Sequence, residues 1–206
     1  MRHGRAGFAA LGLVLAAASV RAVDPPGTPR SQKALAVFLE ARATTGADRG
    51  SRLDRAVALA EEAIAADDRD PVAHFVLFCA LGLRAEMSGA SLQSLTLVRR
   101  MRGEIDRALE LEPQYTDALV GKGTFLMHLP RILGGSRKEG EVLLRRALAL
   151  DPDLFGARVE LARGLDASGD RKQARTEAQG ALAVAERKGD AKDVATARKL
   201  LNELPE

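Results

Sequence analysis

Residues 140–152 read GEVLLRRALALDP, and residues 107–113 end an earlier segment in nearly the same way, as RALELEP. Both runs consist mostly of strong helix formers, and the residue before a proline is disfavoured in a helix. Each run therefore predicts a helix that ends just before its acid–proline pair. In the later run Gly140 and Ala147 lie seven residues apart on one helix face, where small side chains allow a second helix to pack closely.

The same small residues return at a regular distance. Gly140 and Ala147 are followed 34 residues later by Ala174 and Ala181. The matching alanines of four successive segments are Ala63, Ala108, Ala147 and Ala181. Their separations of 45, 39 and 34 residues indicate a repeat whose first two copies carry insertions.

The rest of the chain after residue 30 is expected to be helical, because it is rich in Ala, Leu, Glu and Arg and has little β-branched alternation. Ser51 and Ser136 mark helix starts, since each is followed three residues later by an acid that can complete a capping box. Gly169 is placed to end a helix in a left-handed conformation. The expected helices span about residues 31–43, 51–66, 71–86, 91–111, 115–128, 137–150, 153–167, 171–187 and 190–203.

A period of 34 residues, in which a helix, a turn and a second helix are followed by a proline, resembles the tetratricopeptide (TPR) repeat. The resemblance covers residues 31–187. The chain departs from it at two positions: Arg158 stands where the family often has a large aromatic residue, and Lys122 stands where the family often has leucine. The resemblance implies an all-α, TPR-like helical solenoid of about four helix pairs with a C-terminal capping helix. The matching positions are Leu119, Gly123, Leu126, Ala147, Pro152, Leu161, Ala162, Leu165, Ala174, Ala178 and Ala181.

Residues 129–136, LPRILGGS, interrupt the third helix pair with a proline, an apolar turn and two glycines. This element is similar to the inter-helix element of a TPR subgroup that includes the TatT component associated with some bacterial TRAP transporters and the eukaryotic regulators of microtubule dynamics. The similarity implies a compact version of the fold that binds a ligand or a partner. Bacterial members are often lipid-anchored, but no cysteine lies at the end of the N-terminal apolar stretch of this chain.

Residues 1–22 have the pattern of a secretory signal peptide. Arg2 and Arg5 precede an apolar stretch rich in Ala and Leu, and short side chains follow at the positions that a signal peptidase reads. We expect cleavage after Ala22, with Ala18 as the second choice. The apolar stretch is too short for a spanning helix, and the alternative is an uncleaved interfacial or weak membrane anchor.

The expected mature chain consists of a linker and one helical domain. Residues 23–30 hold three prolines, which suit an extended linker, and residues 31–206 form the domain. Loss of residues 1–22 removes three arginines and no acid, so the formal charge falls from +3 to zero. A neutral chain gives no electrostatic case for nucleic acid as a partner, and membrane contact is expected only if the N-terminal segment stays uncleaved.

Few residues suit catalysis or metal binding. The single cysteine, Cys79, lies in an apolar run and is expected in the core, and His74 and His128 lack a metal-ligand spacing. Residues 134–136 lack the lysine and the preceding strand of a phosphate loop. His128 with Arg131 could suggest acid–base work, but a histidine at a helix end more often caps or packs. We therefore expect a protein that is not an enzyme and has no metal and no cofactor.

In the TPR family the first helix of each pair lines the concave side, and the resemblance carries this role onto specific positions. The residues expected to bind a ligand or partner are Phe75, Leu83, Val120, Thr124, Met127, His128, Val159 and Arg163. The same lining includes Val72, Cys79, Asp117 and Asp166. The alternative is that many of these side chains pack against neighbouring helices, because solenoid helices bury most of their apolar stripe.

These features predict a periplasmic or secreted interaction module that binds a protein or peptide partner in its concave groove. The alternative, from a different functional class, is an accessory component of a solute transporter that binds a small apolar or amphipathic ligand. Residues 190–204 are expected to form the final helix, which covers the last repeat. The side chains expected on its buried face are Val194, Ala197, Leu200, Leu201 and Leu204.

Overall fold

The computed structural model describes residues 25–46, 48–87 and 95–204. Within these ranges the chain forms nine α-helices and one short 3-10 helix, with no strand, which confirms the predicted all-α architecture. The predicted signal peptide and the predicted start of the fourth helix, residues 91–94, lie outside the described residues. The elements are α2 (Pro29–Ala43), α3 (Asp48–Ala66), α4 (Pro71–Met87), α5 (Leu95–Leu111), α6 (Thr116–His128), η2 (Arg131–Leu133), α7 (Arg137–Leu150), α8 (Phe155–Ala167), α9 (Arg171–Lys188) and α10 (Ala191–Glu203).

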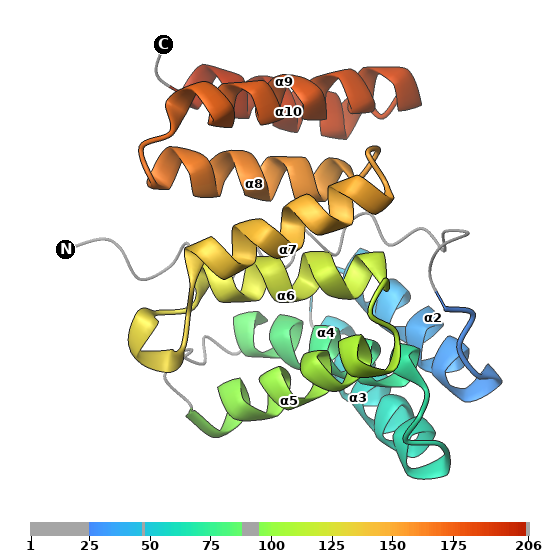
Figure 1. The fold of residues 1–206 in the computed structure, drawn as a ribbon. Coiled ribbons are helices and arrows are strands. Elements are labelled where there is room, and N and C mark those ends of the chain that lie inside the picture. The colour runs from blue at the N-terminus through green and yellow to red at the C-terminus, as the bar shows by residue number, and fades with distance from the viewer. Residues whose placement is uncertain (1–24, 47, 88–94, 205–206) are drawn as a thin grey trace.

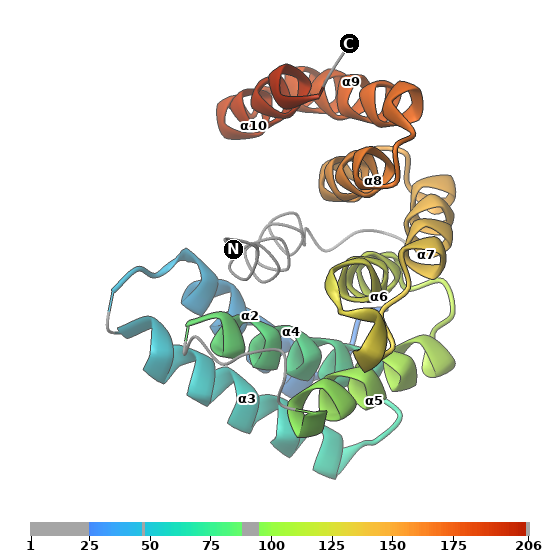
Figure 2. The ribbon, with the colours of Figure 1, turned by 90° about the vertical axis from the view of Figure 1, so that its left-hand side faces the viewer.

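The helices pack in sequence order, and the pairs stack into an open arc (Figures 1 and 2). Helices α2 and α3, α4 and α5, α6 and α7, and α8 and α9 are neighbours, and α10 packs on α9. Figure 2 shows α4, α6 and α8 toward the inner side of the arc, and α5, α7 and α9 toward its outer side. Stacking of helix pairs on their neighbours is the arrangement of a solenoid.

The apolar core consists of two clusters that meet at α6. The first cluster is built mainly from α2 to α5, and the second from α7 to α10. Ala118 and Phe125 of α6 belong to the first cluster, whereas Leu119 and Val120 belong to the second. Because α6 is buried on two sides, few of its side chains remain available to a partner.

The small residues that define the repeat lie at close helix contacts. Ala147, Ala174 and Ala181 are fully buried. A Cβ atom added at Gly140 would lie 2.5 Å from the carbonyl oxygen of Gly123, so α6 and α7 touch through their backbones at this point. The role predicted for the small residues is thus confirmed.

Ion pairs explain the two departures from the repeat pattern. Arg158 of α8 reaches α9, where its Nη1 donates to Oε2 of Glu177 at 2.8 Å. Its guanidinium lies over Gly180, at which a Cβ would be only 2.9 Å from Nη1. Lys122 of α6 places its Nζ 2.7 Å from Oδ1 of Asp106 on α5. Polar contacts at both positions replace the apolar packing expected there.

Every predicted helix end lies within one residue of its observed position, whereas several starts differ. Helix α2 begins at Pro29, so the last two residues of the predicted linker are helical, and α8 begins at Phe155, two residues later than predicted. Helix α3 begins at Asp48, and the Ser51 hydroxyl donates to the Asp48 carbonyl at 2.9 Å from inside the first turn, so Ser51 is not a cap. At Ser136 the predicted cap is present, with the N–H of Glu139 3.3 Å from the hydroxyl oxygen. The Ser136 N–H bonds instead to the carbonyl of Leu126, so the reciprocal half of the capping box is missing.

Candidate binding site

The eight residues predicted to bind a partner divide into two groups by burial. The buried group consists of Phe75, Leu83, Val120, Thr124 and Val159. The group that keeps part of its surface exposed consists of Met127, His128 and Arg163. The second group contains the residues that a partner can reach directly, and a binding role stays a prediction for both groups.

A buried carboxylate joins two of the exposed residues. Glu160 of α8 has a side chain with no exposed surface. Its Oε2 lies 2.8 Å from Nε2 of His128 at the end of α6, and its Oε1 accepts from Nη1 of Arg163 at 3.3 Å. Two groups that can carry positive charge compensate the burial of the carboxylate. Glu160 thereby fixes the positions of His128 and Arg163 relative to each other.

Met127 fills a space between three helices. A Cβ added at Gly164 of α8 would lie 1.7 Å from its Cε, and one added at Gly140 of α7 would lie 2.4 Å from its Cγ. The thioether chain therefore occupies the room that these two glycines leave, which is a common use of a flexible methionine.

The inserted segment, residues 129–136, forms a fixed turn between α6 and α7, which we call the elbow. Its 3-10 helix η2 is followed by Gly134, whose φ of +82° favours glycine. The N–H groups of Leu133 and Gly135 bond to the carbonyl of Pro130 at 2.9 and 3.1 Å. Arg102 of α5 donates to the carbonyls of Gly134 at 2.8 Å and Leu133 at 3.3 Å. These bonds hold the elbow against the body of the protein.

A pocket of about 600 Å³ lies beside the elbow, and we call it the elbow pocket. This volume is within the usual range of small-molecule sites. Two of the predicted binding residues line it together with residues of the elbow and the first turns of α7. The full lining is Met127, His128, Leu129, Pro130, Arg131, Gly135, Ser136, Arg137, Lys138, Glu141 and Ser168.

The solved structures similar to this one include several helical repeat proteins. MamA from Desulfovibrio magneticus RS-1 has a TM-score of 0.54 and 17% identity, with 86% of this chain and 96% of that chain covered. TTC0263 from Thermus thermophilus, described as a thermophilic TPR protein, has a TM-score of 0.50 and 17% identity, with 84% and 99% covered. The chain has the fold of a TPR solenoid. No protein-family model matches the sequence, and no curated protein matches it either.

The two hydroxyls of the elbow pocket and the single cysteine of this TPR solenoid serve the fold. In the elbow pocket the Ser136 hydroxyl caps α7, and the Ser168 hydroxyl donates to the carbonyl of Gly164 at 2.9 Å. Burial raises the pKa of the Cys79 thiol well above its ordinary value, so it stays protonated. Among the described residues no cluster of His, Cys, Asp and Glu is arranged for a metal ion, and no helix is long and apolar enough to span a bilayer.

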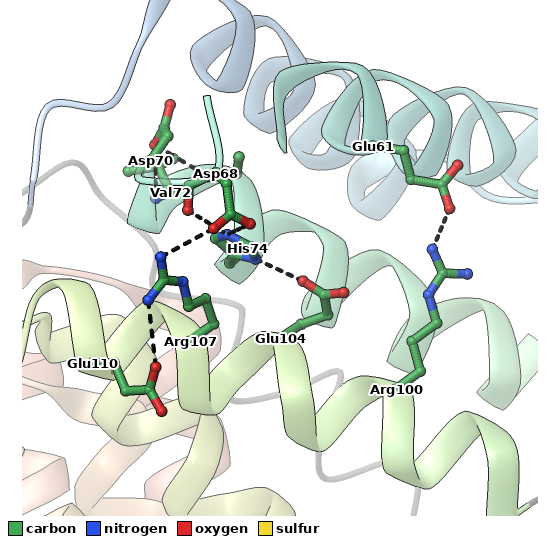
Figure 3. Close-up of polar contacts among 10 residues, drawn as sticks. Glu61, Asp68, Asp70, Val72, His74, Arg100, Glu104, Arg107 and Glu110 are labelled. Atoms are coloured by element: carbon green, nitrogen blue, oxygen red, sulfur yellow. Dashed lines mark hydrogen bonds and ion pairs between the residues drawn. The ribbon is translucent and has the colours of Figure 1, made fainter. Parts of the chain in front are cut away.

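A second polar cluster surrounds His74 in the first half of the solenoid (Figure 3). Nδ1 of His74 lies 2.7 Å from Oε2 of Glu104 on α5, and Nε2 lies 3.1 Å from the carbonyl oxygen of Asp68 before α4. Arg107 bridges Oδ2 of Asp68 at 3.0 Å and Oε2 of Glu110 at 3.5 Å. The His74 side chain at the centre of this cluster is only 5% exposed, so its bonds to Glu104 and Asp68 serve to link the helices.

No pattern in the sequence indicated the role of Glu160. The three-residue spacing of Glu160 and Arg163 on one helix face was visible, but such pairs are common on exposed helix surfaces. His128, which distinguishes Glu160 from an ordinary exposed carboxylate by bonding to it, lies 32 residues away on another helix. Only the stacking of α8 on α6 brings the two side chains together.

Proposed function

We propose that the protein is an exported, non-enzymatic interaction module that binds a protein or peptide partner through the inner face of its TPR solenoid. The observation that carries the proposal is the arrangement of Met127, His128 and Arg163. They come from α6 and α8 on the inner side of the arc and remain partly exposed, and Glu160 holds two of them in place. A fixed set of partly exposed side chains suits recognition, because little ordering is needed on binding.

A catalytic role has less support from the described residues. The hydroxyls in the elbow pocket are bonded to backbone groups, and the one cysteine is buried. The two histidines of the described residues bond to carboxylates on neighbouring helices, which accounts for their positions without a reaction. Export is proposed from the N-terminal pattern alone, in which two arginines precede a short apolar stretch.

A photo-crosslinking experiment tests the proposal. We expect p-benzoylphenylalanine in place of Asp166, a partly exposed residue of α8, to give a discrete adduct with one envelope protein on irradiation. The matched control places the same amino acid at Arg146, an exposed residue of the outer helix α7. Adducts of equal yield and pattern from the two positions, or none from Asp166, would contradict binding at the inner face.

The second candidate function is the transport accessory that binds a small solute. The observation in its favour is the volume of the elbow pocket, which suits a small molecule. Its lining, however, carries Arg131, Arg137 and Lys138 and is not the apolar surface that an apolar ligand requires. Native mass spectrometry of the purified protein distinguishes the candidates, since a retained solute of defined mass would favour the transport role.

A further inference from the structure

The elbow pocket has an excess of positive charge. Arg131, Arg137 and Lys138 line it, and they are exposed. In the part of the chain that the structure describes, none of the three is within ion-pair distance of a carboxylate. The one carboxylate of the lining, Glu141, accepts two hydrogen bonds from Arg145, at 3.1 Å from Nε and 2.9 Å from Nη2. Its negative charge is therefore already compensated from outside the pocket.

The neighbouring acid Glu139 does not change this balance. Glu139 precedes Glu141 on α7 but lines a different and smaller pocket, of about 100 Å³, together with Arg102 and Lys122. The elbow pocket thus presents three cations from two elements, one on η2 and two on the first turn of α7. Like charges gathered at one site repel, so a negatively charged ligand would relieve their repulsion.

The elbow is a tightly closed turn, which fixes the backbone from which Arg131 extends. A Cβ added at Gly135 would lie 1.8 Å from the carbonyl oxygen of Leu129, so the turn is closed on itself by direct backbone contact. Beside the pocket, the same turn displays Ile132, which is 92% exposed. A large apolar side chain held outward by a fixed turn is suited to contact an apolar residue of a partner.

We propose that the elbow pocket binds an acidic segment of a protein partner, with carboxylates paired to Arg131, Arg137 and Lys138 and an apolar side chain against Ile132. This inference rests on the proposed function and names the chemistry of the partner. A pocket of about 600 Å³ is far larger than a single phosphate needs. A flat bilayer surface cannot fill a concave site, whereas an extended chain with several carboxylates can.

The test measures fluorescence anisotropy of a labelled ELEELE peptide with the exported protein, purified as the cell processes it. We expect saturable binding that weakens as salt is added, and no binding of the matched QLQQLQ peptide. Arg137→Glu combined with Lys138→Glu is expected to weaken binding by about tenfold or more. The control combines Arg146→Glu with Lys172→Glu, which makes the same change in net charge at exposed sites outside the pocket lining.

Three outcomes would overturn the inference. An equal loss in both double variants would show a general charge effect and no site. Binding of phosphatidylglycerol vesicles, lost in Arg137→Glu/Lys138→Glu while ELEELE does not bind, would assign the cations to a lipid surface. If ELEELE does not bind but the crosslinked adduct at position 166 still forms, the acidic segment is rejected and binding of a partner at the inner face stands. If that adduct is absent as well, the proposed inner-face function is itself rejected.

Discussion

Deletion of residues 190–206 is expected to lower the melting temperature of the protein by about 10 °C or more, or to make it aggregate. These residues include α10, which covers the end of the second core cluster. Ala197, Leu200 and Leu204 are buried there, and Val194 and Leu201 pack against the same cluster. Enclosure of the two buried leucines contributes about 3–6 kcal/mol to the free energy of unfolding, and its loss exposes an apolar end of the solenoid.

Thermal melting followed by circular dichroism, together with size-exclusion chromatography, measures both consequences. Point variants in full-length protein separate packing from chain length. Leu200→Ala is expected to cost about 2–5 kcal/mol, whereas Lys199→Ala should have little effect because its side chain is 78% exposed. A truncated protein that stays monomeric and melts with the full-length chain would mean that α10 is not a cap.

The helix ends could be predicted from the sequence because they depend on residues close together in the chain. Prolines after Glu112 and Asp151 ended helices where expected, and Gly169 has the left-handed φ of +87° that its position required. The wrong start of α3 has a local cause as well. A serine in the first turn of a helix can donate to a backbone carbonyl of the preceding residues, as Ser51 does to Asp48. Ser51 also has an acid, Asp54, three residues later, so its sequence pattern is the same as that of a capping serine.

The predicted binding residues were less certain because their helices pack on more than one side. Val120 and Thr124 lie on the helix shared by both core clusters, and Val159 lies in the second cluster, so positions that line the inner side also serve the core. A helical periodicity marks which face is apolar but not how many neighbours cover it. The elbow pocket depends on contacts between distant residues, such as Arg102 with Gly134, which no local pattern reveals.

Substitution of His74 by alanine is expected to cost about 2–4 kcal/mol of the free energy of unfolding. The carbonyl oxygen of Asp68 can only accept and the Glu104 carboxylate accepts as well, so a doubly protonated ring can donate from Nε2 to the first and from Nδ1 to the second. This arrangement favours the positively charged ring. Removal leaves a cavity and a Glu104 side chain that is only 20% exposed without its partner.

The stabilisation by His74 should also depend on pH, with a defined sign. Burial lowers the pKa of His74, but the hydrogen bonds to Glu104 and Asp68 and the charges of both carboxylates outweigh it, so the pKa is raised above its ordinary value. A raised pKa in the folded state adds stability that is fully present below about pH 6.5 and is lost as the pH rises through the folded-state pKa. Urea unfolding from acidic to alkaline pH should show the difference in the free energy of unfolding between wild type and His74→Ala shrinking as the pH rises.

The control is Arg100→Ala, which removes an exposed ion pair between Arg100 of α5 and Glu61 of α3 (Figure 3). This variant should cost less than about 1 kcal/mol. A difference for His74→Ala that stays constant across this pH range would show that the buried ring is held neutral, and the charged His74–Glu104 link would have to be abandoned.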